Sequence, residues 1–382
     1  MHLPHHEQHH LHRLSEVKRL YWSHTIAAFG SYLAIIFIPI YLLRIDFSLL
    51  QVFIFFALSG LFWSLCSPLA GRLIGRIGAN RVLAIANLIN VSFFILLVLL
   101  KDHSWLFYIT AAVNGLESAF YMTAFRINFS KAKSPQKAGR QVGLMNALIM
   151  FSHGAAPVIG GLIAQGYGMS VVYAITIILG LVAIVPLLSG PEIVTRRPLD
   201  FSLLDLKKIR RDLLAAFGFT VNAAVDAVIW PLFISLIIVG YAGIGLVSSL
   251  IVFVSIAVSL YVGRREDKNG ERPYITRGST LMFTGSSLRL AASTASHVAG
   301  INTLTGIGSA YVYTPYFSRY YKHADEEPRL EYLTAIQAAN GMGYFILFTL
   351  LALISLIASD KLTLLAGFLL SLPGIYAMGK VR

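Results

Sequence analysis

Residues 49–81 read LLQVFIFFALSGLFWSLCSPLAGRLIGRIGANR, and this stretch contains the pattern that the rest of the chain repeats. Its first part, residues 49–70, is an apolar run with no charged side chain. A helix of about 20 apolar residues matches the hydrocarbon thickness of a bilayer. The run ends in a short loop with three basic side chains, Arg72, Arg76 and Arg81. The stretch therefore predicts a membrane-spanning helix followed by a basic loop.

Basic residues alternate along the whole chain in the same way. Of the 31 lysines and arginines, 27 fall at the termini or in every second gap between apolar runs, whereas the alternate gaps hold only Arg44, Lys101 and Lys361. Short loops rich in lysine and arginine remain on the cytoplasmic side of a membrane. The alternation therefore predicts an even number of spans, both termini in the cytoplasm, and a multi-pass protein of the cell (inner) membrane.

The composition indicates the same class of protein. Hydrophobic residues make up 56% of the 382, the mean hydropathy is +0.70 and only 13% of residues are charged. A soluble protein of this length would need more polar residues to cover its surface. The net charge of +13 flanks apolar spans, where topology and anionic lipid explain it better than nucleic acid does. Cys66 is the only cysteine, which excludes disulfides and cysteine-based metal sites.

Twelve apolar runs are predicted to span the membrane, each as a helix, because a backbone in lipid must satisfy its own hydrogen bonds. The expected spans are residues 21–43, 49–70, 82–100, 105–125, 142–164, 171–188, 213–236, 242–262, 278–296, 301–317, 333–357 and 362–377. Twelve helices of about 20 residues leave no room for a separate soluble domain. The predicted fold class is an all-α membrane protein.

The two halves of the chain resemble each other. A shift of 192 residues superposes matching residues, namely Gly71 on Gly263, Gly78 on Gly270, Tyr121 on Tyr313, Phe125 on Phe317 and Ala132 on Ala324. This predicts a tandem duplication, with a cytoplasmic tail at 1–20, a six-helix bundle at 21–188, a cytoplasmic linker at 189–212 and a second six-helix bundle at 213–382. The end of the linker mixes apolar and basic residues, which predicts either a short helix on the membrane surface or a solvated charged segment.

The loop from Gly71 to Arg81 resembles the signature loop of the major facilitator superfamily, which reads glycine-x-leucine-x-aspartate-basic-x-glycine. Gly75 stands where the family usually has aspartate. In the family this aspartate forms a charge interaction that holds the inward-closed state, and the first half of this chain lacks it. The equivalent loop of the second half carries the acid and the base as Asp267 and Lys268. The resemblance implies the two-bundle fold of this family, with gating residues at both loops: Gly71, Arg76, Gly78, Arg81, Gly263, Asp267, Lys268 and Gly270.

Residues 154–161, in the fifth span, read GAAPVIGG and look like the glycine- and proline-rich motif of exporters in this superfamily. Small residues allow close helix approach between the halves, and proline bends a helix so that one end can act as a gate. Pro157, Gly160 and Gly161 are therefore candidate gating residues. Generic helix packing is the alternative.

Two carboxylic acids lie about midway along predicted spans, Glu117 in the fourth and Asp226 in the seventh. An ionisable group at that depth costs roughly 2.5–3.5 kcal/mol, so it usually faces a cavity, a partner or a transport path. Loss of hydration there makes a carboxylic acid able to exchange a proton near neutral pH. Both acids are candidate proton-coupling residues, with His153 as a candidate relay, and a hydrogen-bonded structural role is the alternative for each.

Polar side chains around these acids are candidate substrate contacts: Asn114, Tyr121, Asn222, Trp230, Ser309, Tyr313, Gln337 and Asn340. The first four share helical faces with Glu117 or Asp226. Hydrogen bonding between helices explains the others equally well. Arg289 is alone in the ninth span, so it either pairs with an intramembrane carboxylate or extends to the membrane surface.

Histidines are concentrated at the start of the chain, as His2, His5, His6, His9, His10 and His12. This composition predicts a disordered cytoplasmic tail, and metal binding is the alternative. His24, near the start of the first span, is predicted to be an interfacial residue.

Together with the resemblance, these features predict secondary active transport by alternating access, in which two bundles rock about a site near the membrane midplane. Proton-coupled efflux of an amphipathic or hydrophobic small molecule is the first hypothesis. Proton-coupled uptake or facilitated diffusion of a small polar solute such as a sugar is the alternative, and a non-transporting membrane receptor is the hypothesis from another class. We expect no enzyme activity, cofactor, metal site or nucleic-acid partner, and we expect a monomer in the lipid bilayer.

Overall fold

The computed structural model describes the backbone of residues 5–132, 138–189, 197–238, 240–269 and 272–378. Within these ranges, side chains are not described for residues 5–18, 131–132, 138–147, 149–150, 153, 250–251, 253–254, 260 and 263–269. Every regular element in the described ranges is a helix. The predicted all-α fold class is therefore confirmed, as lipid requires of a chain that must satisfy its backbone hydrogen bonds internally.

The helices before the linker follow the predicted spans. They are α1 (His5–Ala34), η1 (Ile35–Phe37) and α2 (Ile38–Arg44) in the first span, then α3 (Leu49–Ile77), α4 (Ala79–Leu100), η2 (Ser104–Leu106) with α5 (Phe107–Ala132), α6 (Ala138–Tyr167), and α7 (Met169–Val182) with α8 (Val185–Leu188). The break between α1 and α2 coincides with Pro39, which lacks the N–H that would continue the helical ladder.

The helices after the linker repeat this order. They are η4 (Phe201–Leu203), then α9 (Leu206–Ala224), the π-helical segment η5 (Val225–Ile229) and α10 (Trp230–Ser235) in one span, followed by α11 (Tyr241–Asn269), α12 (Arg272–Leu288) with η6 (Arg289–Ala291), α13 (Ala295–Glu326), α14 (Arg329–Ser355) and α15 (Asp360–Met378). The order of the helices in both halves is consistent with twelve spans.

Seven of the described helical stretches are long and apolar enough to cross a membrane: Arg19–Arg44, Leu49–Ile77, Ala79–Leu100, Met169–Leu188, Leu206–Ser235, Arg329–Ser355 and Asp360–Met378. The other expected spans coincide with α5, α6, α11, α12 and α13. The helices α5 and α13 carry many of the polar side chains of the candidate site, which lowers their hydropathy. A helix surrounded by other helices tolerates such side chains better than one that faces lipid.

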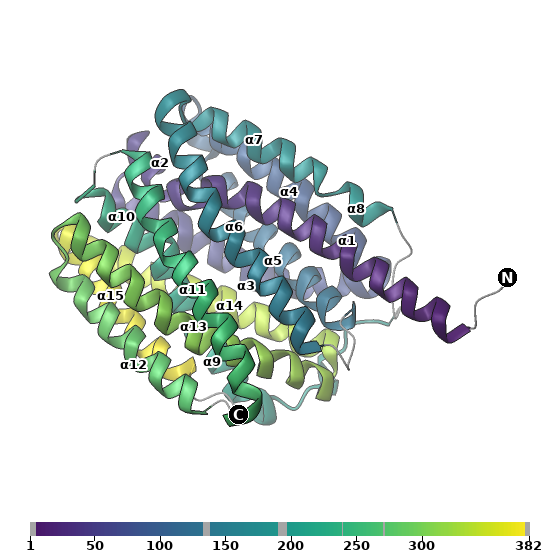
Figure 1. The fold of residues 1–382 in the computed structure, drawn as a ribbon. Coiled ribbons are helices and arrows are strands. Elements are labelled where there is room, and N and C mark those ends of the chain that lie inside the picture. The colour runs from purple at the N-terminus through teal and green to yellow at the C-terminus, as the bar shows by residue number, and fades with distance from the viewer. Residues whose placement is uncertain (1–4, 133–137, 190–196, 239, 270–271, 379–382) are drawn as a thin grey trace.

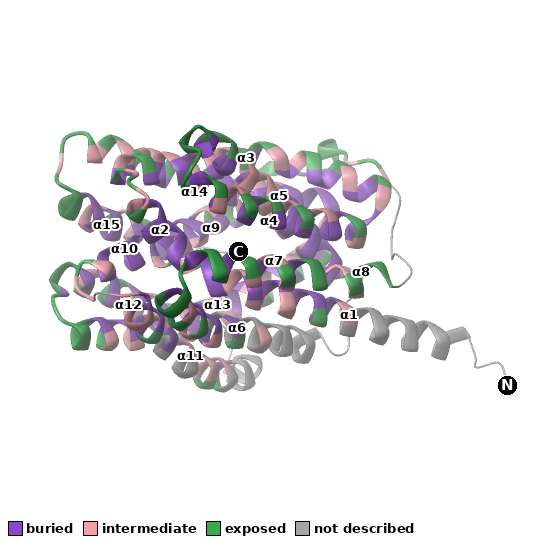
Figure 2. Ribbon diagram, turned by 90° about the horizontal axis from the view of Figure 1, so that it is seen from above, coloured by how far each residue is buried: buried purple, intermediate pink, exposed green. Residues whose placement is uncertain are grey.

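The helices lie side by side in one bundle (Figure 1). In that view α4, α7 and α8 lie at one side of the bundle and α12 and α15 at the other, with α3, α6, α11 and α14 between them. The two closest pairings that join the halves are α3 against α14 and α6 against α11. Buried residues lie mainly on the inward faces of the helices (Figure 2).

Several helix ends differ from the predicted boundaries. The expected loop at 71–81 is almost entirely helical, because α3 continues to Ile77 and α4 begins at Ala79, with Gly78 between them. Gly78 has φ = 98°, a left-handed backbone conformation that glycine adopts without steric cost, and this single residue reverses the chain.

The predicted surface helix at the end of the linker is also wrong as a separate element. Its residues form the first turns of α9, which begins at Leu206 and continues into the seventh span. Asp205 caps this helix by accepting hydrogen bonds from the N–H groups of Lys207 and Lys208, which fixes its start within the basic segment. The predicted tail is likewise helical from His5 onward, in α1, and its histidine side chains at positions 2 to 12 lie outside the described residues.

Candidate functional site

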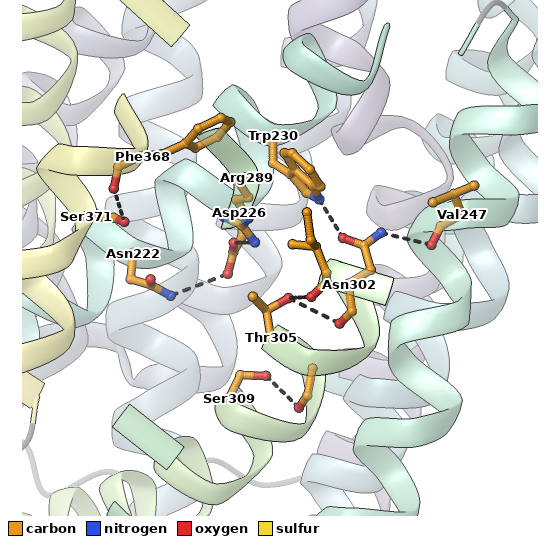
Figure 3. A network of polar contacts seen from close by, with 12 residues as sticks. Asn222, Asp226, Trp230, Val247, Arg289, Asn302, Thr305, Ser309, Phe368 and Ser371 are labelled. Carbon is orange, nitrogen blue, oxygen red and sulfur yellow. Dashed lines mark hydrogen bonds and ion pairs between the residues drawn. The ribbon is translucent and has the colours of Figure 1, made fainter. Parts of the chain in front are cut away.

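Asp226 and Arg289 form an ion pair inside the second half of the chain (Figure 3). The Arg289 Nη2 atom lies 2.6 Å from Asp226 Oδ1, and the side chain of Arg289 is only 2% exposed whereas that of Asp226 is 39% exposed. Of the two alternatives for Arg289, pairing with an intramembrane carboxylate is the one observed, and extension to the membrane surface is wrong. The arginine stands on the buried side of the pair, and the carboxylate keeps an accessible face.

The local backbone places Asp226 at this point. Residues 225–229 form one π-helical turn, and Pro231 follows at the start of α10. Proline cannot donate the hydrogen bond that would continue an α-helix, and π-helical turns are frequent at functional sites. A π-helical turn has more residues than an α-helical one. Asp226 and Trp230 are therefore not separated by a regular α-helical turn.

Polar and aromatic side chains surround the ion pair. The Asn222 amide donates to Tyr313 Oη at 2.9 Å and to Asp226 Oδ2 at 3.4 Å. The indole N–H of Trp230 donates to Asn302 Oδ1 at 2.6 Å, and the Arg289 guanidinium lies 4.8 Å from the Trp230 ring centroid. The structure therefore brings together four residues that the sequence singled out as candidates, Asn222, Asp226, Trp230 and Tyr313.

Glu117 is the candidate acid of the first half, and it lies on α5. Its side chain is half-buried on α5 and is hydrogen-bonded by Ser118, at 3.4 Å, and by Asn90 from α4. None of the ion pairs among the described side chains involves Glu117. The two candidate acids thus differ, because Asp226 has a cationic partner and Glu117 has only neutral hydrogen-bond donors.

Tyr121, one turn from Glu117, is bonded to His24. The His24 Nδ1 and Tyr121 Oη atoms are 2.5 Å apart, and the imidazole stacks on the Phe125 ring with centroids 3.8 Å apart. His24 is buried between helices, at 6% exposure, and its predicted place near the membrane interface stays a prediction. The aromatic rings of α5 enclose the histidine, which sequence reasoning had missed because nothing in the spacing shows which way α1 is turned.

Two of the residues that the 192-residue shift superposes have similar contacts. Tyr121 and Tyr313, which the 192-residue shift superposes, each bond a side chain on the first helix of their own half, His24 on α1 and Asn222 on α9. The acids do not follow the repeat, since position 117 corresponds to Ser309 and position 226 to Ala34. The scaffold is repeated and the ionisable groups are not.

Other side chains predicted to contact substrate form hydrogen bonds with neighbouring groups of the protein itself. The Gln337 amide donates to Tyr320 Oη at 3.4 Å, and that of Asn340 donates to Gln337 at 3.2 Å; both residues are buried. Asn114 donates to Ser59 Oγ at 3.1 Å, and Ser309 bonds the carbonyl of residue 306 at 3.0 Å. The side chains of His153, Gly263, Asp267, Lys268 and Gly270 lie outside the described residues.

The halves meet at the end of the bundle that carries Arg72, Arg76, Arg126, Arg197 and Arg329, which we call the basic end. Arg126 on α5 donates to Tyr321 Oη on α13 at 2.9 Å. Its guanidinium also lies 4.5 Å from the Phe317 ring centroid and 5.7 Å from that of Tyr320. A cation held against aromatic faces contributes about 0.5–2 kcal/mol, so this contact favours a closed basic end.

Arg126 was not predicted as a gating residue, although three aromatic residues near the end of α13 are a signal that could have indicated it. Replacing Arg126 by glutamine is expected to open the basic end more often, because both the charge-assisted hydrogen bond and the cation–π contacts are lost. A cysteine at the fully buried position of Thr123, in a chain with Cys66→Ser, reports opening by its rate of reaction with an impermeant maleimide. We expect a rise of roughly tenfold, from about 1–2 kcal/mol, and a smaller one for Arg126→Lys. Equal rates in all three proteins would contradict this role.

The linker covers the loop that lacks the family's aspartate. A Cβ atom on Gly75 would lie 2.4 Å from the Arg197 carbonyl oxygen, and one on Gly71 would lie 2.6 Å from Thr334 Oγ1. Arg197 in turn contacts Glu331 at 2.5 Å, and Glu331 is fully buried and accepts the Asp200 N–H at 3.2 Å. The place of the missing acid is thus filled by backbone, and Glu331 on α14 carries the buried negative charge instead.

Restoring the family residue by Gly75→Asp is therefore expected to weaken the protein rather than strengthen its closure. The new side chain would displace the Arg197 backbone, and overpacking of this kind costs about 1–3 kcal/mol. Thermal unfolding of the purified protein measures the loss, and Arg76→Gln, which changes the net charge by the same amount at an exposed position one residue away, is the matched control. An increase in unfolding temperature for Gly75→Asp alone would show that the linker does not fill this space.

Small residues join the halves along α6 and α11. A Cβ atom on Gly161 would lie 2.5 Å from the Tyr241 carbonyl oxygen, and one on Gly245 would lie 2.2 Å from the Pro157 carbonyl oxygen. At the end opposite the basic end, Arg44 lies 4.0 Å from the Tyr241 ring centroid. Pro157 and Gly161 thus lie at the contact between the halves, whereas Gly160 packs against Leu33 of α1 in its own half; their gating role stays a prediction.

Known proteins share this arrangement of helices. Residues 20–348 match the sequence model of the Major Facilitator Superfamily. The chain is similar to the human organic anion transporter MFSD10 (TETRAN), with a TM-score of 0.72 and 11% identity over 96% of this chain and 99% of that one. It is also similar to a bacterial homologue of the iron transporter ferroportin in an outward-facing state with soaked iron, with a TM-score of 0.67 and 15% identity over 95% and 97% of the two chains. No curated protein sequence matches it.

Proposed function

The chain belongs to the major facilitator superfamily, and on this premise we propose that it exports a small amphipathic molecule across a membrane in exchange for protons. Transmembrane transport and the absence of enzyme activity follow from the family; the coupling ion, the direction and the substrate are the proposal. The observation that carries it is a pair of partly exposed carboxylic acids on central helices, one in each half, with unequal partners.

Glu117 is the better proton carrier of the two. A coupling acid must alternate between charged and neutral forms, and Glu117 contacts only neutral donors among the described side chains. Asp226 is 2.6 Å from a buried arginine, and the charge of that arginine would lose its partner if the carboxylate were taken away. We therefore assign proton transfer to Glu117 and a positioning role to the Asp226–Arg289 pair.

An amphipathic substrate without negative charge fits the charges of this chain. The name of MFSD10 refers to organic anions, but here the buried Arg289 is already engaged by Asp226. The accessible face of Asp226 and the aromatic ring of Tyr313 beside Asn222 favour a neutral or cationic group with apolar parts. Among the residues searched, no group of three or more His, Cys, Asp or Glu is placed to hold a metal ion, so iron is not carried over from the ferroportin homologue.

The glycine- and proline-rich stretch of α6 supports export, because it resembles the motif of exporters and lies at the α6–α11 contact. The test is proton release into vesicles that contain a pH-sensitive dye and the purified chain. A panel of amphipathic cations, sugars and organic anions is added under an imposed pH gradient. Proton movement with amphipathic cations only is the expected result. Movement with sugars would favour uptake of a polar solute, and binding without any flux would favour a receptor.

A further inference from the structure

One face of α9 carries basic residues directly above apolar ones. Lys207, Arg210 and Arg211 are exposed in its first two turns, and Leu214 follows one turn later at 53% exposure. Residues three or four apart lie on the same face of a helix. The neighbouring Lys208 is paired with Glu327, but the ion pairs among the described side chains include none of these three residues.

The apolar part of this face borders a groove. A cavity of about 160 Å³ lies between α9, α14 and α15, lined among others by Leu214, Val221, Ile346, Leu350 and Leu370. Leu214, Ile346 and Leu350 are exposed, so the groove opens on the outer surface of the bundle. It includes neither Glu117 nor Asp226 and is separate from the candidate transport site.

The groove exists because α9 and α15 approach closely at small residues. A Cβ atom on Gly218 would lie 2.5 Å from the Gly374 carbonyl oxygen. Two glycines leave no side chain to fill the surface above their contact, and Pro373 beside them adds only a short ring. A hollow apolar surface of this kind faces acyl chains in a membrane.

We propose that this groove binds an anionic phospholipid, with one acyl chain in the groove and the phosphate on Arg210 and Arg211. Guanidinium groups bind phosphate oxygens through two parallel hydrogen bonds, and each basic residue near an anionic membrane surface contributes about 1 kcal/mol. One helical turn separates Arg211 from Leu214, so a headgroup and its chain can be held at once. The unpaired positive charges favour an anionic lipid over a zwitterionic one. The proposal does not depend on what the protein transports.

Native mass spectrometry of the full chain, delipidated in detergent, tests this site. Phosphatidylglycerol and phosphatidylcholine with identical acyl chains are added, and bound lipid is counted. The wild-type chain is expected to hold phosphatidylglycerol preferentially. The double variant Arg210→Gln/Arg211→Gln should lose about thirtyfold in affinity for it, which corresponds to two charges at roughly 1 kcal/mol each. The double variant Arg272→Gln/Arg277→Gln removes the same charge from exposed positions on α12 and should bind as the wild type does.

A second variant tests the groove itself. Leu350→Trp fills the groove and should reduce the binding of both lipids, whereas Leu369→Trp, on an exposed face of α15 outside the groove, should not. Glycerol phosphate, which has the headgroup phosphate but no acyl chain, should not compete. Equal binding of the two lipids, equal losses in both arginine double variants, or full competition by glycerol phosphate would each overturn the proposal. Size-exclusion profiles identify any variant that fails to fold. If the Arg210→Gln/Arg211→Gln variant does not fold, Leu350→Trp still tests the site, because it keeps both arginines.

Discussion

Replacing Asp226 by asparagine is expected to cost about 3–5 kcal/mol of stability, because it leaves a buried arginine charge without its partner. The Arg289 side chain is 2% exposed and cannot reach water. Replacing Arg289 by methionine should cost less, since the Asp226 carboxylate is 39% exposed and can be hydrated. The ranking of the two losses follows from the unequal burial of the two partners.

The double variant Asp226→Asn/Arg289→Met should recover most of the loss, because it removes both charges together. Thermal unfolding of the four proteins in one detergent measures the coupling. Asp102→Asn, at an exposed position, is the control for a change of charge alone. Strictly additive losses in the double variant would show that the pair does not stabilise the fold.

Replacing Glu117 by glutamine is expected to abolish proton-driven transport while the protein remains folded. Glutamine keeps the size of the side chain and its ability to accept hydrogen bonds, but it cannot release a proton. The neighbours Ser118 and Asn90 are neutral, so no buried charge is left without a partner and the unfolding temperature should change by only a few degrees. Flux in vesicles under a pH gradient should fall to the level of vesicles without protein.

Asp360→Asn is the matched control for Glu117→Gln, because it neutralises an exposed acid at the start of α15. Transport by exchange of substrate for substrate, without net proton movement, should survive in the Glu117→Gln variant. Retention of full proton-driven flux would transfer the coupling role to another group. Loss of folding would instead make Glu117 a structural acid, the alternative that the sequence had also allowed.

The architecture could be predicted because its signals are local. Apolar runs of spanning length can be recognised from local composition, without knowledge of any contact between helices. Boundaries near the basic end could not be predicted in the same way. Helices there continue past the ends of the apolar runs, as α3 does to Ile77 and α9 from Leu206, and a polar cap such as Asp205 is the local sign of where one begins.

The site was predicted in part. Asn222, Asp226 and Trp230 could be grouped in advance because helical spacing predicts a shared face on one span, whereas Tyr313 joins them from α13. Contacts between helices depend on how each is rotated and shifted, which one sequence does not show. Arg289 could therefore be given two alternatives but no partner, and the role of Arg126 at the basic end was not recognised.

The departure at Gly75 is explained by a contact far away in the sequence. The Arg197 backbone occupies the space of the missing side chain, and Glu331 provides the buried carboxylate for this linker. Neither residue belongs to the loop motif, so comparison with the family pattern shows that an aspartate is missing without showing what replaces it.

The central claim is that the two halves open alternately at the two ends of the bundle. Spin labels measure this directly in a Cys66→Ser chain, one pair at the basic end on exposed Arg72 and Lys322, and another at the opposite end on exposed Asp102 and Ser359. Changing the pH or adding substrate should lengthen one distance while it shortens the other. Two distances that stay fixed under every condition, or that lengthen together, would contradict alternating access in this protein.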